Sequence, residues 1–397
     1  MQKKICIISS QHISSNPRVW KEALSLSGNG YDVTIVTINN SAVHRERDKV
    51  ILEKLGGRVK YVVAANIIYA EIPLLQKIRY KFRGLYAKLL KKMSFDTVYL
   101  LSKAPAEIYN AALKVNADLY IAHTESSLSI GRKLIEKGKK VAFDIEDWYS
   151  RDYLNAQRPV KLLASMERYA LHNGAYVTCP SHAMADALKN VYKSNKTPVV
   201  IYNSFPAEAV EEHRSNGTSL VWFSQTTGPG RGLEKIINSL ANIAIPVKLV
   251  LIGTCSQTYM DKLNSIFPFS SGHTLQVLPQ VTHDELHGML SKYDIGLALE
   301  EKYPDNKDKT ISNKIFQYLQ AGIKVLATDT EGQKEVAINF PEVVQIVDAA
   351  DTADWHHKLN DLINRRVDKT TIIDKYKNEF SWQVQEVKLL QLVSNVL

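Results

Sequence analysis

Two short segments in the second half of the sequence carry the residues best suited to bind phosphate. In the first, Gly228, Gly230 and Gly232 follow an apolar run and precede the helix-forming sequence LEKIINSL. Glycine lets a backbone approach a ligand closely, and the free N–H groups at a helix N-terminus favour an anion. Arg231 adds a fork of donors that suits phosphate. The segment is a candidate phosphate loop, although a flexible connection with a surface arginine would carry the same residues.

The second segment is ISNKIFQYLQAGIKVLATD. Ser312 can cap a helix that starts at Asn313, and Gly322 has the residue type that ends one. Lys314 would then lie in the first turn, where the helix dipole disfavours a cation unless an anion is bound beside it. Gln317 follows one turn later on the same side. A capped amphipathic helix explains the apolar residues but explains Lys314 less well, so we expect an anion near Lys314.

Polar residues also follow apolar runs in the first half of the sequence. His123 comes directly after one such run, and Asp144, Glu146 and Asp147 lie at the end of the next. Ligands bind at the carboxyl ends of the strands in open α/β sheets, which makes His123 a candidate functional residue, although a lone histidine is more often structural. The acids can orient hydroxyl groups or serve as a base, or they can cap the following turn.

A further candidate lies near the N-terminus, where Asn16 and Pro17 have the residue types of a helix N-cap and first position. Arg18 would then lie in the first turn, at the mouth of the sheet. It can meet a phosphate or an acceptor there, but we expect an exposed first-turn side chain.

The elements that must position these residues alternate regularly. Short β-branched runs alternate with amphipathic runs of helical length, which is typical of a parallel sheet covered on both faces. The polar segment 206–217 interrupts this pattern, and the chain after about Asp368 is expected to be helical to its end. We therefore expect an α/β protein with two Rossmann-like, doubly wound domains. The predicted strands are residues 5–9, 31–38, 118–122, 141–144, 176–179 and 199–202 in the first half and residues 220–224, 247–252, 274–278, 295–299 and 325–328 in the second, with a helix at residues 19–26.

The bulk composition narrows the class of protein. The 397 residues are 45% hydrophobic and 23% charged, as in an ordinary folded protein, and their net charge of +9 suggests a negatively charged partner. Cys6, Cys179 and Cys255 are far apart, which argues against a disulfide framework or a zinc cluster and fits a reducing compartment. The first apolar run is too short for a signal peptide, and no run approaches the roughly 18 apolar residues of a membrane-spanning helix. We expect a cytoplasmic protein.

Residues 74–93 form a basic amphipathic segment that contains no acidic residue. Its apolar residues recur at helical spacing, and most of its lysines and arginines flank them. Such a helix can lie in an anionic membrane surface. It can also pack on the domain by its apolar stripe and leave a solvated basic face. The stripe consists of Leu75, Ile78, Phe82, Leu85, Tyr86 and Leu89.

The sequence SNKIFQYLQAGIKVLATD resembles the donor-site signature of retaining, family-4-type glycosyltransferases of the GT-B fold. The GPGRGLEKII stretch is similar to their phosphate loop, SSQHISSNPRVWKEALSLSGNG to their first loop and helix, and FSWQVQEVKLLQL to their closing helix. The resemblance covers most of the chain and is most specific between residues 220 and 329. It implies an acceptor domain at residues 1–205 and a donor domain at residues 206–375, facing each other across a cleft. Residues 376–397 would cross back to the first domain.

The resemblance also implies roles for individual residues. Arg231 and Lys314 would bind the donor diphosphate, and His123 would lie near the transferred sugar. The family usually has a glutamate in place of Gln317 and often an arginine in place of Gln225. The implied donor-binding residues are Gln225, Gly230, Gly232, Leu278, Glu300, Glu301, Asn313 and Gln317, and the implied acceptor-binding residues are Ser15, Arg18, Asp144, Glu146 and Asp147.

These observations together predict an enzyme that moves a sugar from a nucleotide-sugar donor to a glycan or lipid-linked acceptor with retention of configuration. We expect no metal site and no cofactor beyond the donor. The expected location is the cytoplasm, with peripheral attachment to the inner face of the membrane through residues 74–93. The main alternative is a weakly active or inactive nucleotide-sugar-binding relative, because Gln317 and Gln225 make the site less charged. A nucleotide-sugar epimerase and a nucleic-acid-binding protein are further alternatives, and the absence of a recognised reading motif disfavours the latter.

Overall fold

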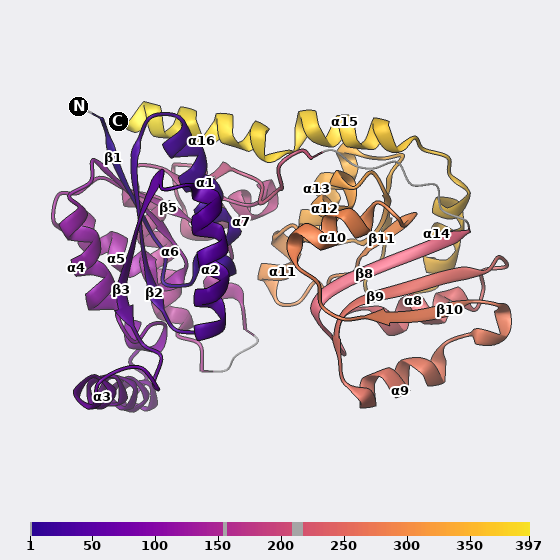
Figure 1. The fold of residues 1–397 in the computed structure, drawn as a ribbon, viewed down its shortest axis with the longest axis horizontal. Coiled ribbons are helices and arrows are strands. Elements are labelled where there is room, and N and C mark those ends of the chain that lie inside the picture. The colour runs from indigo at the N-terminus through magenta and orange to yellow at the C-terminus, as the bar shows by residue number, and fades with distance from the viewer. Residues whose placement is uncertain (1, 154–156, 209–216) are drawn as a thin grey trace. The chain divides into compact units, whose positions relative to one another are not determined.

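In a computed structural model, which describes residues 2–153, 157–208 and 217–397, the chain forms two compact units (Figure 1). Unit 1 contains Met1–Pro180, Met184–Ile201 and Glu386–Leu397, and unit 2 contains Ser181–Ala183 and Tyr202–Gln385. Most of the polar segment expected to separate the two domains, residues 209–216, lies outside the described residues. Within the described residues, no helix combines the length and apolarity needed to cross a membrane.

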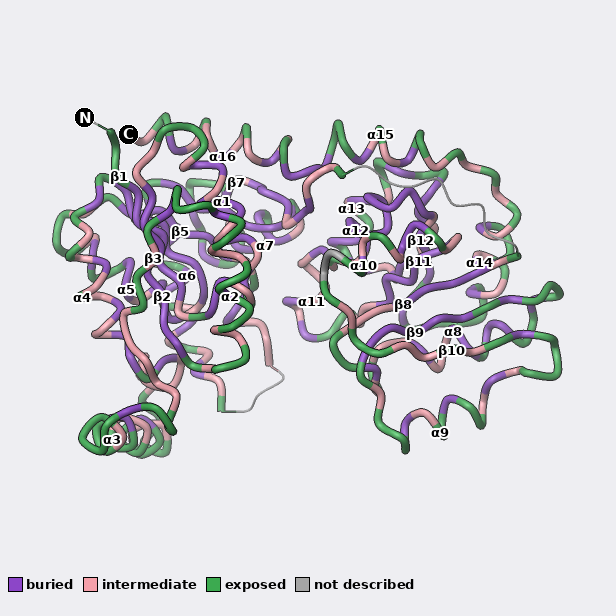
Figure 2. The backbone as a smooth tube through the Cα atoms, in the orientation of Figure 1, coloured by how far each residue is buried: buried purple, intermediate pink, exposed green. Residues whose placement is uncertain are grey.

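Unit 1 is built on a seven-stranded parallel sheet in the order β3-β2-β1-β4-β5-β6-β7. Its central strands are buried on both faces, as Figure 2 shows, because helices cover both sides of such a sheet. The strands are β1 (Lys4–Ile8), β2 (Asp32–Asn39), β3 (Val59–Asn66), β4 (Leu119–His123), β5 (Val141–Asp144), β6 (Val177–Cys179) and β7 (Val199–Val200). The longer helices are α1 (Pro17–Gly28), α2 (Ala42–Leu55), α3 (Leu74–Lys92), α4 (Pro105–Val115), α5 (Glu125–Glu136), α6 (Val160–Asn173) and α7 (His182–Tyr192).

Unit 2 repeats this architecture with a six-stranded parallel sheet in the order β10-β9-β8-β11-β12-β13. Trp222, Leu251 and Trp355 are among the fully buried side chains of its core. The strands are β8 (Thr218–Thr227), β9 (Val247–Cys255), β10 (Thr274–Leu278), β11 (Ile295–Ala298), β12 (Lys324–Thr328) and β13 (Val344–Val347). The helices are α8 (Leu233–Leu240), α9 (Gln257–Ile266), α10 (His283–Leu290), α11 (Asp305–Lys309), α12 (Asn313–Gln320), α13 (Glu331–Asn339), α14 (Trp355–Asn364) and α15 (Lys369–Glu379).

In each unit the strand order reverses beside the first strand, between β1 and β4 and between β8 and β11. Ligands of open α/β sheets bind outside the carboxyl ends of the strands at such a switch point. The predicted fold class, two Rossmann-like α/β domains, is therefore confirmed.

Three expectations about secondary structure are wrong. Strands β3 and β13 were not predicted; both are edge strands, and the exposed residues of β3 break up the apolar signal. The chain after Asp368 is not one helix, because α15 ends at Glu379 and α16 (Trp382–Val396) begins after a break. Ser312 precedes α12, but in the described part of the chain its side chain makes no capping hydrogen bond, since its hydroxyl donates to Glu300 instead.

Candidate functional site

A cavity of about 450 Å³ in unit 2 collects several of the residues proposed from sequence. It lies where the later parts of β8 and β9 meet the N-terminus of α12, near the switch point of the sheet. Gln225, Asn313, Lys314 and Gln317 all contribute to its wall. The complete lining is Phe223, Ser224, Gln225, Ile252, Gln280, Val281, Leu286, Ser312, Asn313, Lys314 and Gln317.

The charge at this cavity comes from an ion pair. Lys314 Nζ lies 2.7 Å from Glu300 Oε1, and both side chains are mostly buried. Burial raises the pKa of Glu300, but the ammonium of Lys314 and its hydrogen bond outweigh this effect, so the pKa lies below its usual value. Lys314 also lies over the ring of Trp222, with Nζ 5.9 Å from the ring centre. The carboxylate of Glu300 thus compensates a lysine that the dipole of α12 disfavours.

The glycine-rich loop joins β8 to α8 and lies outside the lining of this cavity. Gly230 and Gly232 both have φ of 72°, a left-handed conformation that favours glycine. Gly232 is the N-cap of α8, and a Cβ atom there would lie 3.0 Å from Leu299 Cβ. Arg231 between them is partly exposed, and no salt bridge to it is formed by any residue that the structure describes. The loop therefore offers a cation and the start of a helix to an anion.

The other expected donor residues are spread around the same sheet edge. Leu278 is partly exposed at the end of β10, and the neighbouring Gln280 and Val281 line the cavity in its place. Glu301 is partly exposed and lies 3.8 Å from Lys235 Nζ. Gln317 is 5% exposed within α12. The structure thus brings Gln225, Asn313, Lys314 and Gln317 to one cavity, with Glu300 bound to Lys314.

In unit 1, the expectation that Arg18 is an exposed first-turn residue is wrong. Its side chain is fully buried, and its Nε lies 2.5 Å from Asp144 Oδ2. Its Nη1 donates to the carbonyl of Ile201 at 2.6 Å. Burial lowers the pKa of Arg18, but Asp144 and Glu22 raise it more. Arg18 and Asp144 therefore form a buried ion pair. The sequence did not predict this pair, because Arg18 lies in a helix and Asp144 in a strand that are far apart along the chain.

His123 lies at the centre of the same buried cluster. Its Nε2 lies 3.1 Å from Glu22 Oε2, and its Nδ1 lies 3.1 Å from both Asp144 and Glu146. Burial lowers the pKa of His123, but these carboxylates raise it well above its usual value, which favours the protonated ring. Its side chain has no exposed surface. Both ring nitrogens are thus occupied by carboxylates of unit 1.

Three members of this cluster have the geometry of a metal-ligand set. Glu22, His123 and Asp144 offer ligand atoms within 4.8 Å of one another, and all three are buried. The guanidinium of Arg18, however, already lies against Asp144 and 3.5 Å from Glu22. A cationic side chain therefore supplies the positive charge that a metal ion would bring, and the residues do not fit a metal site.

The remaining acceptor candidates are accessible to different degrees. Ser15 and Asp147 are exposed, whereas the side chain of Glu146 is 17% exposed. Asn16 precedes α1 as expected, but its amide donates to Glu146 at 2.6 Å instead of capping the helix. Glu146 is thus held between this buried cluster and the protein surface.

A second cavity, of about 510 Å³, lies at the carboxyl ends of β1, β2 and β3. The hydroxyl of Ser10 is 2.8 Å from that of Thr124, which links the loops after β1 and β4 at the switch point. This cavity was not predicted, although Ser10 directly follows the predicted strand 5–9 and Asn40 lies two residues after the end of the predicted strand 31–38. Its polar lining residues include Ser10, Asn40, Tyr99, Ser102 and Lys103.

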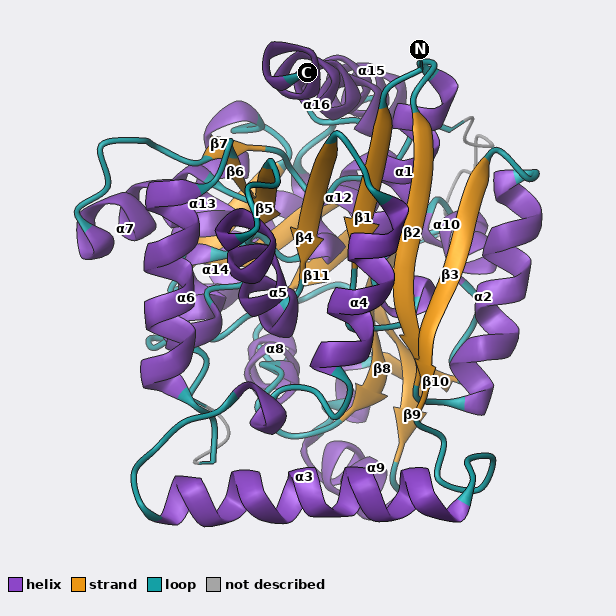
Figure 3. Cartoon of the chain, turned by 90° about the vertical axis from the view of Figure 1, so that its left-hand side faces the viewer, coloured by secondary structure: helices purple, strands orange, loops and turns teal. Residues whose placement is uncertain are grey.

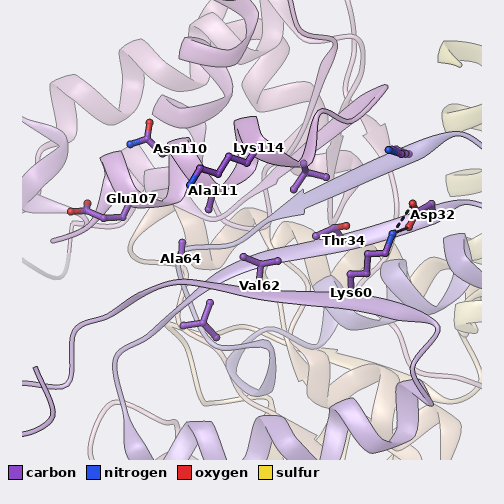
Figure 4. A pocket seen from close by; sticks show the side chains of 12 residues that line it. Asp32, Thr34, Lys60, Val62, Ala64, Glu107, Asn110, Ala111 and Lys114 are labelled. Atoms are coloured by element: carbon purple, nitrogen blue, oxygen red, sulfur yellow. Dashed lines mark hydrogen bonds and ion pairs between the residues drawn. The ribbon is translucent and has the colours of Figure 1, made fainter.

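A third cavity, of about 610 Å³, lies at the opposite end of the strands of unit 1 (Figure 4). Lys4 and Asp32 begin β1 and β2 there, and Lys60 near the start of β3 donates to Asp32 at 2.8 Å. Ligands of such sheets bind at the carboxyl ends, and this ion pair satisfies both charges. We therefore assign no function to this third cavity.

The comparisons with known proteins agree with this geometry at the level of the fold. No protein-family model and no curated protein matches the sequence. Sucrose-phosphate synthase from Thermosynechococcus elongatus is similar, with a TM-score of 0.71, 13% identity and coverage of 100% of this chain and 99% of that chain. HepE from Anabaena, in complex with UDP, has a TM-score of 0.69, 14% identity and coverage of 99% and 100%. The lipopolysaccharide outer core galactosyltransferase WaaB has a TM-score of 0.62, 12% identity and coverage of 100% of both chains.

The two parallel-sheet units and these full-length similarities define a protein of the GT-B fold class. The structures it resembles include glycosyltransferases, one of which was solved with UDP.

Proposed function

We propose that this protein is a glycosyltransferase that moves a hexosyl group from a nucleotide-sugar donor to a glycan or lipid-linked acceptor with retention of configuration. The observation that carries the proposal is the cavity at the N-terminus of α12, where Lys314 lies beside Gln317 and Gln225. The bound UDP in a similar structure of the same fold supports a nucleotide as the ligand.

In this proposal the donor diphosphate is held by Lys314, Arg231 and the N-termini of α8 and α12. Negative charge develops on the diphosphate as the sugar leaves, and fixed cations and helix N–H groups stabilise such charge. These groups can take the place of a bound metal ion. Lys314 would exchange some of its contact with Glu300 for a phosphate oxygen.

The other residues of the cavity would orient the donor. Gln317 can hydrogen-bond a ribose hydroxyl, and Gln225 and Asn313 can bind further polar atoms. Gly230 and Gly232 let the loop approach the diphosphate, whereas Leu278 would lie beside the base. Glu300 and Glu301 would lie near the sugar.

The acceptor would bind to unit 1. We assign contact with its hydroxyl groups to the accessible residues Ser15, Glu146 and Asp147. Arg18, Asp144 and His123 are enclosed, so we propose that they act on the acceptor indirectly, by holding Glu146 in place. The protein would work in the cytoplasm, with a membrane surface as a further partner of residues 74–93.

A thermal-shift screen with a panel of nucleotide sugars tests donor binding. One donor should raise the melting temperature of the wild type, and Arg231→Ala should reduce this shift strongly, since it removes a cation from the diphosphate site. Arg132→Ala is the matched control, because Arg132 is exposed on α5 in unit 1 and bound to Glu136. If no nucleotide sugar stabilises the wild type, the proposal is wrong.

The main alternative is a relative that binds nucleotide sugars without transferring them. It is favoured by the neutral Gln317 and Gln225, where the resemblance leads us to expect a glutamate and often an arginine. Such a protein would pass the thermal-shift test but would neither transfer nor hydrolyse the donor.

A further inference from the structure

Helix α3 exposes the apolar face that an amphipathic helix normally packs against its own domain. Leu75 is 81% exposed, Phe82 66% and Leu89 58%. The buried residues of this helix are instead Tyr80 and Ala87. The alternative in which the apolar stripe packs on unit 1 is therefore wrong. The further exposed apolar residues on or just after the helix are Leu74, Ile78, Leu85, Tyr86, Met93 and Phe95.

Polar contacts fix which face of α3 points inward. Arg83 Nη1 donates to Glu107 at 2.9 Å and to the carbonyl of Lys103 at 2.9 Å. Lys91 Nζ donates to Asp96 at 2.7 Å. Arg83, Ala87 and Lys91 are four residues apart and so lie on one side of the helix. The apolar stripe is thus held away from unit 1 by bonds on the opposite side.

A row of lysines runs along one border of the exposed stripe. Lys81, Lys88 and Lys92 each directly precede an apolar residue of the stripe or its continuation, so they lie about 100° around the helix from it. All three are exposed, and no described residue forms a salt bridge with them. On the other border, Arg79 lies 3.3 Å from Glu107.

We propose that α3 lies flat in the surface of an anionic lipid bilayer. The apolar stripe would enter the boundary between headgroups and acyl chains, and Lys81, Lys88 and Lys92 would contact lipid phosphates. Charge favours this partner over a second copy of the chain, because pairing two such faces would bring the lysines of one helix close to those of the other.

The position of α3 relates membrane docking to the cavity at the carboxyl ends of β1, β2 and β3. Helix α3 lies beyond the end of the sheet toward which β1, β2 and β3 run (Figure 3). The cavity that includes Ser10, Asn40 and Tyr99 lies at the carboxyl ends of the same strands. Docking through α3 would therefore turn this end of unit 1 toward the lipid headgroups, where a lipid-linked acceptor would be found. The docking itself does not depend on sugar transfer.

Vesicle flotation of the full chain tests the proposal, with no donor or acceptor present. Vesicles of phosphatidylcholine mixed with phosphatidylglycerol should carry the wild type upward, whereas pure phosphatidylcholine should carry at least tenfold less. Phe82→Ser with Leu89→Ser should lower binding to the anionic vesicles at least tenfold. Lys81→Gln with Lys88→Gln and Lys92→Gln should do the same, and added salt should weaken wild-type binding because it screens the lysines.

Matched controls separate this surface from general effects of polarity and charge. Ile338→Ser removes an apolar side chain that is 78% exposed on α13. Lys114→Gln with Lys133→Gln and Lys137→Gln removes three exposed lysines elsewhere on unit 1. Both control variants should float like the wild type, and circular dichroism should show that all variants are folded.

Two outcomes would overturn the proposal. The first is equal flotation of the wild type and the α3 variants. The second is a wild-type dimer in light scattering that the Phe82 and Leu89 changes convert to a monomer, with no flotation, because the stripe would then bind a second copy. Neither outcome would affect donor binding by unit 2, which the thermal-shift screen measures separately.

Discussion

Lys314 and Glu300 form a largely buried ion pair, with 2.7 Å between Nζ and Oε1, at the N-terminus of α12. The lysine belongs to the wall of the unit 2 cavity, and the acid follows strand β11. The pair therefore couples the cation proposed to bind phosphate to the strand end proposed to lie near the sugar. Any anion that binds at Lys314 must compete with the carboxylate of Glu300.

Lys314→Ala should weaken UDP binding about ten- to a hundredfold, because a charge-assisted hydrogen bond contributes about 1.5–3 kcal/mol. Glu300→Gln should strengthen UDP binding, because it removes the carboxylate that competes with phosphate. Isothermal titration calorimetry measures both effects. Lys309→Ala is the control, since Lys309 in unit 2 pairs with Asp308 and Glu331. Unchanged UDP affinity in Lys314→Ala would show that phosphate binds elsewhere.

Gln317→Leu should separate the contribution of the ribose to UDP binding from the contribution of the diphosphate. A neutral hydrogen bond contributes about 0.5–1.5 kcal/mol, so the affinity for UDP should fall about three- to tenfold. The affinity for inorganic pyrophosphate should stay the same, because the proposed phosphate contacts remain. An equal loss for both ligands would mean that the change disturbs the whole cavity.

Gly232→Ala should destabilise the protein by about 1–2 kcal/mol, because a residue with a Cβ atom is strained at a φ of 72°. The added Cβ would also lie 3.0 Å from Leu299 Cβ. Gly228→Ala is the matched change in the same loop, where a Cβ would meet nothing within 4 Å. Urea denaturation should separate the two variants, and similar midpoints would contradict the strain argument.

Arg18→Met should destabilise unit 1 by about 3–5 kcal/mol, because removing the buried guanidinium leaves the carboxylates of Asp144 and Glu22 with too little compensating positive charge. Arg132→Ala should cost less than about 1 kcal/mol, since Arg132 forms an exposed pair with Glu136. Urea denaturation followed by circular dichroism tests both. If Arg18→Met unfolds at the same urea concentration as the wild type, the buried cluster contributes little to stability.

Glu167 should make the stability of unit 1 depend on pH. Burial raises its pKa from 4.5 to about 7, although Ser150 and Tyr192 donate hydrogen bonds that lower it. A raised carboxyl pKa means that the folded state holds the proton more tightly. The stability from this proton is complete below about pH 4.5 and is lost as the pH rises to about 7.

Glu167→Gln replaces the carboxyl by a group that stays neutral at every pH. The wild type should therefore lose about 3 kcal/mol relative to this variant between pH 4.5 and 7, and the difference should then level off. Denaturation curves across this range measure it. Parallel stability profiles of the two proteins would contradict the raised pKa.

The sequence was informative wherever a pattern is local. The continuous apolar runs of β1 and β12 predict buried parallel strands, and Gly322 ends α12 as expected, with a left-handed φ of 70°. The edge strand β3 was not predicted because exposed residues interrupt its apolar pattern, and β13 was not predicted because it has only four residues. Lys314 and Gln317 could be proposed because they follow a recognisable helix start, whereas Gln225, within β8, was expected only from the resemblance to the glycosyltransferase family.

The remaining features depend on residues that are distant in the sequence. Arg18 of α1 and Asp144 of β5 meet only in the folded protein, so neither local pattern reveals a buried pair. The exposed stripe of α3 could not be distinguished from a packed one, because helical spacing defines a face but not its neighbour. Glu107 and Asp96 bind Arg83 and Lys91 and so determine which face of α3 points toward unit 1. Both acids follow the end of the helix in sequence.

The most direct test of the account is a turnover assay with the donor that stabilises the protein and a panel of glycan and lipid-linked acceptors. Mass spectrometry should detect a glycosylated acceptor together with the released nucleotide, NMR should show the same anomeric configuration in donor and product, and Lys314→Ala should abolish most of the product. Donor binding without transfer or hydrolysis for any acceptor would contradict the account and identify a nucleotide-sugar-binding protein instead.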